Sequence, residues 1–299
     1  MKEVMPLPPS QPNGRYCIIS NPIAGGRKKQ RILNTIRREL TPAPLLFAST
    51  AMDGSAGEAV RKGHEAGMTC FIAVGGDGTI QSVVNELDPE QDCLGLIVAG
   101  SGNGFAEFFG YRRNVRQNIQ KLKSHQVSQV DTLTVNGQRF VNLAGVGFDA
   151  QVAEMVKKSR YRGFQAYFRA VARLMFRSIY WKGSVVLDDI TVDDHFLTVV
   201  VANAGIFGYG FRIADQALAD DGLMTVVLIR RVARWRYLLG LPFLIWGNPS
   251  RLSWFQQLTS TRVDILPEQP TPVQADGELF PQADRYRFEI EPRSLRLLI

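Results

Sequence analysis

Cysteine and histidine are both scarce in this sequence of 299 residues, which contains three of each. The cysteines are Cys17, Cys70 and Cys93, and none stands in a CxxC pair or at metal-ligand spacing from a histidine. This pattern argues against a zinc or redox centre built from these residues. Each cysteine falls in or beside an apolar run that is typical of a strand, so we expect buried thiols in a reducing, cytoplasmic compartment.

Long apolar runs are also missing. The longest, "YLLGLPFLIW" at residues 237–246, has about half of the roughly 20 residues that a membrane-spanning helix needs. The first residues, "MKEVMPLPPSQPNG", contain no apolar signal core, and their prolines predict a disordered leader over residues 1–13. We therefore expect no transmembrane segment. Burial in the core is the expectation for residues 237–246, and a place in a lipid entrance is the alternative.

The standard phosphate-binding motifs are absent as well, since the sequence has neither GxxxxGK[ST] nor a GxGxxG at its first strand-to-helix crossing. Three other glycine-rich turns are present, and each follows an apolar run and precedes a helical pattern: "NPIAGG", "GGDG" and "GSGNG". After the second turn, Ile80, Val83 and Leu87 recur at helical spacing. Strands that alternate with helices in this way predict a parallel sheet with right-handed crossovers.

The carboxyl ends of parallel strands lie at one edge of a sheet, so the three turns are expected to converge there. Backbone N–H groups at helix N-termini attract anions, and glycine lets a phosphate approach them closely. A net charge of +7 is consistent with an anionic ligand. We therefore expect a nucleotide-phosphate site at this edge. Its polar side chains are those of Asn21, Asp77, Thr79, Ser101 and Asn103.

From about residue 131 the pattern changes to short, turn-separated runs rich in β-branched residues, such as "FLTVVVANAG" and "YRFEIEP". Such runs predict an antiparallel β-sandwich. We expect an α/β plus all-β protein with two lobes: a nucleotide-binding α/β domain over residues 14–130 and a β-sandwich domain over residues 131–284. Residues 285–299 are expected to close one of the two lobes.

Six motifs in this order resemble those of the diacylglycerol kinase catalytic-domain family, which includes bacterial lipid kinases and the sphingosine and ceramide kinases. They are "NPIAGG", "GGDGTIQSVVNEL", "GSGNGFA", "GVGFDA", "ALADDGLM" and "ADGE". The resemblance implies a nucleotide lobe similar to those of NAD kinases and phosphofructokinases. It also implies an ATP-dependent lipid kinase acting on the hydroxyl of diacylglycerol or of a sphingoid-like lipid, with ATP and Mg²⁺ in the cleft between the lobes.

By the same resemblance, Asp276 is the general base, with Glu278 as the alternative, and Asp131 is a carboxylate of the active-site network. The residues implied to hold ATP come from the Asn-Pro turn and the glycine loops: Asn21, Pro22, Gly25, Thr50, Gly75, Gly76, Asp77, Gly78, Thr79, Ser101 and Asn103. Taken alone, these carboxylates also have structural interpretations. Asp77 could cap a helix, and Asp276 stands in an Asp-Gly pair that is typical of a hairpin turn.

A structural Mg²⁺ is implied at Asp221, together with the main-chain carbonyls of Leu218 and Leu223. Ca²⁺ at this position, or a solvated loop without metal, is the alternative. One motif departs from the family: many bacterial diacylglycerol kinases have an aspartate where this chain has Gly104, so part of their carboxylate network is absent or replaced. "GSGNGFA" is closer to the sphingoid-kinase form of that motif, which leaves the lipid acceptor open.

Residues 155–187 contain eight lysines and arginines, interleaved with aromatic residues, and no acidic residue. One interpretation is a helix with a solvated basic face and an aromatic core face, and the other is a surface that docks on anionic lipid. The implied partner is a lipid substrate at a membrane surface, with peripheral association, no nucleic acid, and a possible homodimer. The alternative functions are a NAD-kinase-like enzyme with a soluble acceptor and a nucleotide-binding membrane sensor without turnover.

Overall fold

The computed structural model divides the chain into two compact units. It describes residues 4–6, 15–22, 29–100, 102–161, 163–177, 180–246 and 249–299. Unit 1 consists of Met1–Asp131 and Pro292–Ile299, and unit 2 consists of Thr132–Glu291. The C-terminal segment expected to close one lobe is therefore divided, because residues 285–291 belong to unit 2 and residues 292–299 to unit 1.

Unit 1 is built on a parallel sheet with the strand order β3-β2-β4-β5, and the end of β16 pairs with β5 through Leu297 and Leu94. The strands are β2 (Tyr16–Ser20), β3 (Leu45–Ser49), β4 (Cys70–Gly75), β5 (Cys93–Val98) and β16 (Tyr286–Leu298). Every residue of β2, β4 and β5 is buried, as expected for parallel strands that are covered on both faces.

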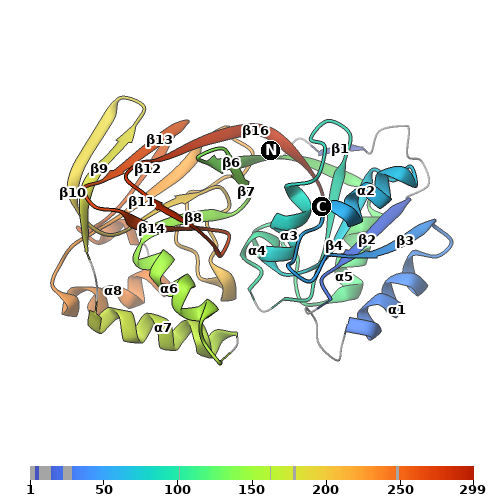
Figure 1. Cartoon of the computed structure of the whole chain (residues 1–299), viewed down its shortest axis with the longest axis horizontal. Coiled ribbons are helices and arrows are strands. Elements are labelled where there is room, and N and C mark those ends of the chain that lie inside the picture. Colours follow the sequence, from blue (N-terminus) through green and yellow to red (C-terminus); the bar gives the residue numbers. More distant parts are fainter. Residues whose placement is uncertain are drawn as a thin grey trace. The chain divides into compact units, whose positions relative to one another are not determined.

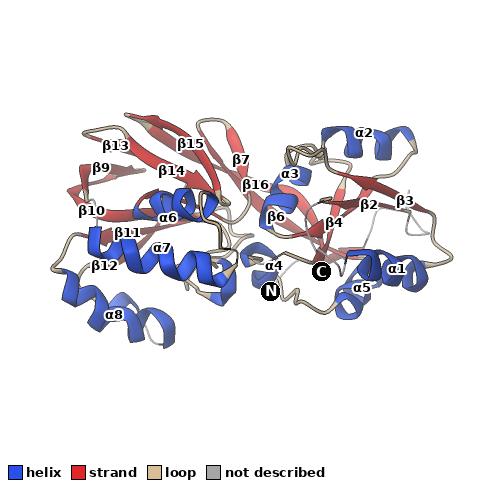
Figure 2. Ribbon diagram, turned by 60° about the horizontal axis from the view of Figure 1, so that its bottom comes forward, coloured by secondary structure: helices blue, strands red, loops and turns tan. Residues whose placement is uncertain are grey.

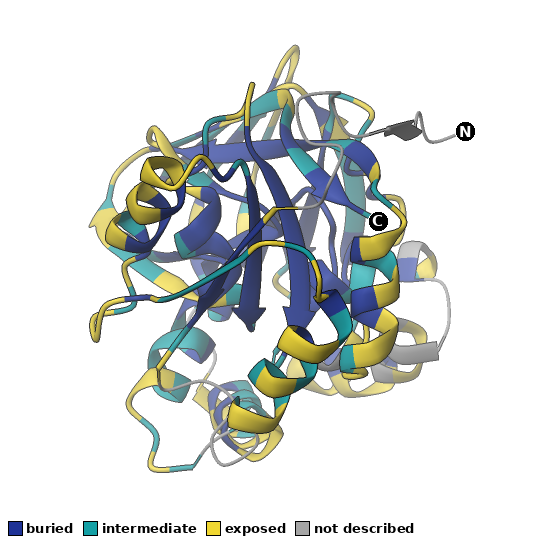
Figure 3. Ribbon diagram, turned by 90° about the vertical axis from the view of Figure 1, so that its right-hand side faces the viewer, coloured by how far each residue is buried: buried dark blue, intermediate teal, exposed yellow. Residues whose placement is uncertain are grey.

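Helices cover both faces of this sheet (Figure 2). They are α1 (Lys29–Leu40), α2 (Gly57–Glu65), α3 (Asp77–Val84), α4 (Gly104–Phe108) and α5 (Val115–Lys123). Ile36 of α1 and Ile119 of α5 share one hydrophobic cluster with Ile18 of β2. The next residue back, Cys17, points to the opposite face, where its thiol donates to the Ala59 carbonyl of α2. Figure 3 shows the buried strands between helices whose outer sides are exposed.

Two of the three cysteines are paired across this sheet. Cys70 and Cys93 are register partners at the start of β4 and β5, their Cα atoms lie 4.9 Å apart, and they form a disulfide. The expectation of three thiols is therefore wrong for these two, because adjacent strands bring together residues 23 positions apart in the sequence. Cys17 is a free, buried thiol, and burial raises its pKa to about 11.

The segment expected to be a disordered leader contains a short strand. β1 (Val4–Pro6) pairs antiparallel with the start of β6 (Gln126–Val135), with Val4 opposite Ser128. The prediction of disorder is wrong for these three residues because β6 offers them a strand edge. The other residues of the predicted leader lie outside the described residues.

Unit 2 is antiparallel. Its strands follow the order β15-β14-β8-β10-β9-β13-β16, and β11 lies between β10 and β12. They are β7 (Gln138–Phe140), β8 (Leu143–Gly147), β9 (Trp181–Leu187), β10 (Ile190–Ala202), β11 (Met224–Arg230), β12 (Phe255–Ser260), β13 (Arg262–Pro267), β14 (Thr271–Ala275) and β15 (Glu278–Ala283). Val199 and Val201 of β10 enter one core, while Val200 and Ala202 enter another. The predicted fold class, a parallel α/β lobe and an antiparallel β-sandwich lobe, is confirmed.

In the described part of unit 2, three helices pack on the strands, together with two short 3₁₀ turns (Figure 1). They are α6 (Phe148–Lys157), α7 (Phe164–Arg177) and α8 (Arg234–Trp246), with η2 (Gly208–Gly210) and η3 (Pro249–Arg251). α8 contains the whole run 237–246 expected in the core, and that expectation is wrong for Leu238, Leu239 and Phe243. Tyr237 is buried against the sheet, whereas Leu238 and Leu239 are 56% and 66% exposed. Among the described helices, none is long and apolar enough to cross a membrane.

The burial of Leu298 predicts that the end of β16 contributes to the stability of unit 1. Leu298 is fully buried in the cluster that contains Ile18 and Ile36. Leu298→Ala should therefore lower the free energy of unfolding by about 2–5 kcal/mol, measured by denaturant titration. Arg296→Ala is the control, because that side chain is partly exposed, lies outside the hydrophobic cluster and donates to the Glu90 carbonyl. Equal stability of the two variants would contradict the packing of residues 292–299 in unit 1.

Candidate functional site

The glycine loops of unit 1 converge at the carboxyl edge of the parallel sheet. Ser20 at the end of β2 pairs with Val74, and Gly75 at the end of β4 pairs with Val98 at the end of β5. The loops that follow these strands therefore start at one level, as the alternation of strands and helices predicts. Of the predicted nucleotide-binding residues, Gly25 and Ser101 lie outside the described residues.

The second and third loops pack backbone against backbone. A Cβ atom added at Gly76 would lie 2.8 Å from the carbonyl oxygen of Gly102, and one added at Gly100 would lie 2.4 Å from Cα of Gly76. Glycine is thus required at both positions for the loops to meet. Gly75 is similarly restricted, because its Cβ would lie 2.3 Å from Oγ1 of Thr79. Gly78 differs, since a Cβ there would meet nothing within 4 Å.

Asp77 ties the two loops together by hydrogen bonding. It is the first residue of α3, and its Oδ2 accepts a hydrogen bond of 2.9 Å from the backbone N–H of Gly104 at the start of α4. Burial raises the pKa of the Asp77 carboxyl to about 6, and the hydrogen bonds from Gly104 and Phe105 act in the opposite direction. Gly104 therefore contributes a backbone N–H to the contact between the second and third loops.

Among the described residues at this edge of the sheet, three buried side-chain oxygens have no hydrogen-bond partner: Oγ1 of Thr50, which follows β3, and Oδ1 of Asp77 and of Asn103 on the second and third glycine loops. A buried polar atom without a partner costs about 1–3 kcal/mol, so such atoms are uncommon in folded proteins. Carboxylate and amide oxygens are also the groups that Mg²⁺ and the hydroxyl or amino groups of a nucleotide would contact. The loops thus fit a ligand with hydrogen-bond donors or an attached cation.

The first loop supplies a positive charge. Lys29 begins α1, and its Nζ donates a hydrogen bond of 3.0 Å to the carbonyl oxygen of Asn21. Burial lowers the pKa of the Lys29 ammonium. An anion at the edge of the sheet would stabilise this charge, as phosphate does in other glycine-rich sites. The next residue of the Asn-Pro turn, Pro22, is exposed.

Asp276 of unit 2 holds three successive backbone N–H groups. Its Oδ2 accepts from Val141 at 2.8 Å, and its Oδ1 accepts from Asn142 at 3.0 Å and from Leu143 at 3.1 Å. Asp276 is nearly buried and has a positive φ of 50°, a conformation that aspartate tolerates better than most residues. Both of its carboxylate oxygens are thus engaged by the start of β8, which restricts their access to a substrate.

Glu278 lies two residues further on, after the Asp-Gly turn, and its environment is different. Its side chain is 57% exposed, and its Oε2 lies 3.0 Å from Nζ of Lys157 on α6. An exposed ion pair of this kind is weak and can rearrange when a ligand binds. The structure therefore makes Glu278 the more accessible of the two predicted carboxylates.

Sequence reasoning missed two residues beside this turn. Asn142 is buried, and its Oδ1 has no hydrogen-bond partner, although its backbone N–H donates to Asp276. Asp149 is buried in the first turn of α6 and hydrogen-bonds to Gln274, whose Oε1 accepts from the Gly277 backbone N–H at 2.7 Å. Burial raises the pKa of Asp149 to about 6. Asp149 belongs to "GVGFDA", so the motif itself was the available signal.

The remaining predicted carboxylates lie elsewhere. Asp131 is fully buried, and its Oδ1 accepts a hydrogen bond of 2.7 Å from the backbone N–H of Arg293, a residue with a positive φ of 53°. Asp221 lies in an exposed turn before β11, where its Oδ1 accepts from the Leu223 backbone N–H at 3.0 Å. Leu218, in the same turn, is 56% exposed. Within the described ranges, no group of three or more His, Cys, Asp or Glu side chains could hold a metal ion.

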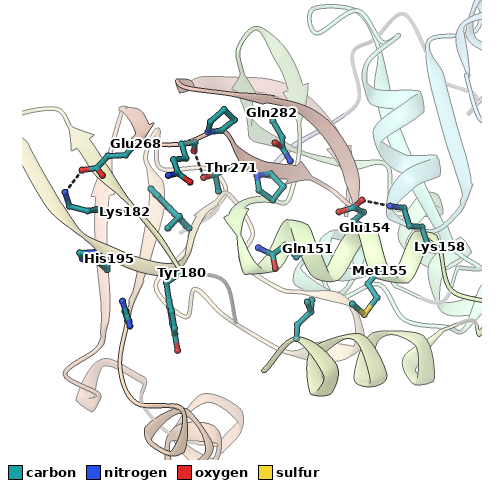
Figure 4. Close-up of a pocket in the computed structure, with 16 residues that line it drawn as sticks. Gln151, Glu154, Met155, Lys158, Tyr180, Lys182, His195, Glu268, Thr271 and Gln282 are labelled. Carbon is teal, nitrogen blue, oxygen red and sulfur yellow. Dashed lines mark hydrogen bonds and ion pairs between the residues drawn. The ribbon is translucent and has the colours of Figure 1, made fainter. Parts of the chain in front are cut away.

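Unit 2 also contains a cavity of about 700 Å³ between α6, α7 and the β9 and β14 strands. Figure 4 shows its lining, in which Met155 and Tyr180 lie among polar side chains. Lys182 is paired there with Glu268. None of the residues predicted to bind ATP, metal or substrate lines this cavity.

Comparison with known proteins identifies two matching domains. Residues 15–135 match the diacylglycerol kinase catalytic domain, and residues 142–299 match the YegS C-terminal NAD kinase beta sandwich-like domain. A probable lipid kinase YegS-like of Shewanella frigidimarina is 27% identical over 234 residues, covering 75% of this chain and 74% of the relative. The diacylglycerol kinase of Bacillus subtilis is 25% identical over 278 residues, covering 88% of this chain and 89% of the relative.

A solved structure agrees with this comparison at the level of the fold. The crystal structure of a diacylglycerol kinase from Bacillus anthracis has a TM-score of 0.80 to this chain, at 20% sequence identity. The match covers 95% of this chain and 96% of the other. At this identity the match shows the fold alone, so the roles of the site residues have to be argued from the geometry of this structure.

The glycine contacts predict a contrast between two valine substitutions. Gly78→Val should fold normally, because a Cβ meets nothing within 4 Å. It should nevertheless weaken ATP binding at least tenfold by isothermal titration calorimetry, since the side chain would occupy the space of a phosphate oxygen. Gly76→Val should instead lower stability, because its Cβ would press on the Gly102 carbonyl. Parent-like ATP affinity in folded Gly78→Val would locate the phosphate elsewhere.

Proposed function

Since this chain belongs to the diacylglycerol kinase family of lipid kinases, we propose that it transfers the γ-phosphoryl group of ATP to the hydroxyl of a lipid. The proposal that ATP binds to unit 1 rests on three buried oxygens at the converging loops, on Thr50, Asp77 and Asn103, which have no hydrogen-bond partner among the described residues. A nucleotide with its cation would supply the missing partners. The basic side chain of Lys29 supports a phosphate at the same edge.

The residues of unit 1 have separable roles in this proposal. Backbone N–H groups at the start of α3 would hold phosphate oxygens, because the first N–H groups of a helix have no partner within it. The loop contact between Gly76 and Gly100 keeps those groups in position. Asp77 and Asn103 would hold Mg²⁺ or the nucleotide through their unpartnered oxygens. Mg²⁺, when bound, would neutralise the charge that develops on the transferring phosphoryl group.

The contacts of unit 2 support Glu278 as the group that accepts the proton from the attacking hydroxyl. Both oxygens of Asp276 already accept backbone hydrogen bonds from residues 141–143, so Asp276 is better suited to fix the turn. Glu278 is exposed, and among the described residues its partner is Lys157, in a surface ion pair. Of the two assignments implied by the sequence, we therefore favour Glu278 as base and Asp276 as positioning residue.

A lipid with a free primary hydroxyl is the proposed acceptor, either diacylglycerol or a sphingoid-like lipid. Gly104 supports keeping both, because it has no side chain at the point where many bacterial diacylglycerol kinases carry an aspartate, so that carboxylate is absent here. A soluble acceptor and a sensor without turnover are the alternatives. ATP consumption that requires lipid vesicles would support the lipid kinase over both.

Two substitutions test the assignment of the base. Glu278→Gln should lower turnover by roughly 10² to 10⁴ with little change in ATP affinity, because the amide keeps the shape but cannot accept a proton. Asp276→Asn should lower both turnover and thermal stability, because an amide presents only one oxygen to the three N–H groups. Turnover is measured with radiolabelled ATP and detergent-dispersed diacylglycerol or sphingosine.

Glu154→Gln is the matched control, since Glu154 is another partly exposed glutamate of unit 2 that pairs with a lysine, Lys158. It should keep parent turnover. If Glu278→Gln turns over at the parent rate while folded Asp276→Asn is inactive with normal stability, the base is Asp276 and our assignment is reversed.

The proposed metal at the turn before β11 is tested separately. Asp221→Ala should weaken Mg²⁺ or Ca²⁺ binding and lower the unfolding temperature in the presence of the ion, because the site loses its only carboxylate. The measurement is thermal unfolding at increasing ion concentration. An ion-dependent rise in unfolding temperature that is the same in parent and variant would rule out a metal at Asp221.

A further inference from the structure

Two helices of unit 2 present large apolar side chains to solvent. Ten large hydrophobic residues are exposed in the described part of the chain, and seven of them lie on α7 and α8. They are Phe164 (58%), Phe168 (62%), Phe176 (76%), Trp235 (61%), Leu238 (56%), Leu239 (66%) and Phe243 (40%). Such a concentration is unusual for a surface in water and is typical of an interaction site.

These exposed side chains are not the faces that the two helices pack against the protein, because each helix buries a different set of residues. α7 already buries Ala166, Ala170 and Leu174, and Ala170 and Leu174 pack in a cluster with Val152 of α6. α8 buries Tyr237 against the sheet. The expectation that the aromatic residues of residues 155–187 form a core face is therefore wrong for its three exposed phenylalanines, because small residues and leucine form the inner face of α7.

The outer faces of the two helices belong to one surface. Met175 of α7 and Tyr237 of α8 pack on the same hydrophobic cluster, which includes Val200 and Val227 of the sheet. Both helices therefore lie on the same side of β10 and β11. Figure 1 and Figure 2 agree with this, since α7 and α8 lie beside one another in both views.

The two helices carry charged side chains of one sign only. Residues 155–187 and 222–263 contain no aspartate or glutamate. Arg173 and Arg177 are exposed on α7, and Arg234 and Arg236 begin α8 beside Trp235. Within the described part of the chain, none of these four arginines forms an ion pair. Exposed apolar residues flanked by unneutralised arginines are typical of helices that lie in the interface of an anionic bilayer.

We propose that the α7 and α8 surface docks unit 2 on an anionic lipid bilayer, with its apolar side chains entering the headgroup region and its arginines contacting lipid phosphates. This rests on the proposed function in one respect, since a lipid kinase must reach an acceptor held in a membrane. A second copy of the chain fits less well, because a symmetric contact through this surface would bring the arginines of both copies together. The exposed Trp235 in the first turn of α8 also suits the membrane interface.

Vesicle sedimentation without ATP tests this directly. The parent should bind vesicles of equal parts phosphatidylcholine and phosphatidylglycerol, and should bind phosphatidylcholine alone at least tenfold more weakly. The double variant Phe168→Ser and Leu239→Ser should lose about tenfold in binding to the mixed vesicles, because two anchors are removed from the headgroup region. The double variant Arg173→Gln and Arg177→Gln should lose most of the preference for phosphatidylglycerol.

The matched control is Met52→Ser with Ile190→Ser, which removes two exposed apolar residues, 77% and 52% exposed, that lie outside α7 and α8. It should bind like the parent. A second readout is quenching of tryptophan fluorescence by brominated phosphatidylcholine in the mixed vesicles, which Trp235→Phe should reduce. If the Phe168 and Leu239 variant binds the mixed vesicles like the parent and Trp235→Phe leaves quenching unchanged, the proposal is overturned.

Two further outcomes separate this proposal from its rivals. If the Phe168→Ser and Leu239→Ser variant loses a concentration-dependent dimer that the parent forms in sedimentation velocity, and still binds vesicles like the parent, the surface is an interface between copies and not a membrane site. If the parent docks on vesicles as described but phosphorylates no lipid in detergent-dispersed assays, the docking surface stands and the proposed kinase function fails.

Discussion

The close contact between the second and third glycine loops is the constraint on which the candidate nucleotide site depends. Gly76 and Gly100 approach so closely that neither has room for a Cβ atom. The Asp77 carboxylate then reaches across to the backbone N–H of Gly104. These contacts join the N-termini of α3 and α4 at one edge of the sheet. They also leave one oxygen each on Asp77 and Asn103 buried without a partner, which favours a ligand that completes them.

In unit 2, one carboxylate holds the backbone through hydrogen bonds and a second carboxylate remains accessible. Both carboxylate oxygens of Asp276 accept hydrogen bonds from the three backbone N–H groups of residues 141–143, at the start of β8. Gln274 accepts a hydrogen bond from the backbone N–H of Gly277 and donates one to Asp149. The turn is therefore rigid at its centre. Glu278 is exposed beside this turn and pairs with Lys157. The two carboxylates therefore differ in access, and only the proposal assigns one of them to the chemistry.

Much of the fold could be predicted from the sequence because its signals are local. Apolar runs followed by glycine turns and helical spacing predicted the parallel sheet and the convergence of its loops. Contacts distant in sequence could not be predicted in this way. The disulfide between Cys70 and Cys93 depends on the register of β4 and β5, and the buried oxygen of Asn142 depends on the hairpin that follows β14.

The helices of unit 2 show a second limit of sequence reasoning. The apolar run that contains Leu238, Leu239 and Phe243 indicates only that these residues avoid water, and both a protein core and a lipid bilayer satisfy that requirement. The structure separates the two cases, because Tyr237 fills the position against the sheet and the other three side chains face outward. Likewise, the sequence identified Asp276 and Glu278 as candidate bases but could not show that the first has both oxygens engaged.

The central claim is that a phosphoryl group passes from ATP to a lipid. The most direct measurement is to incubate the protein and Mg²⁺ with γ-labelled ATP and a total lipid extract, then separate the lipids and identify any that carries the label. The account predicts label in a lipid phosphomonoester, derived from diacylglycerol or a sphingoid-like lipid and absent when the extract is omitted. Label found only in inorganic phosphate or in a water-soluble product, with or without the extract, would contradict it.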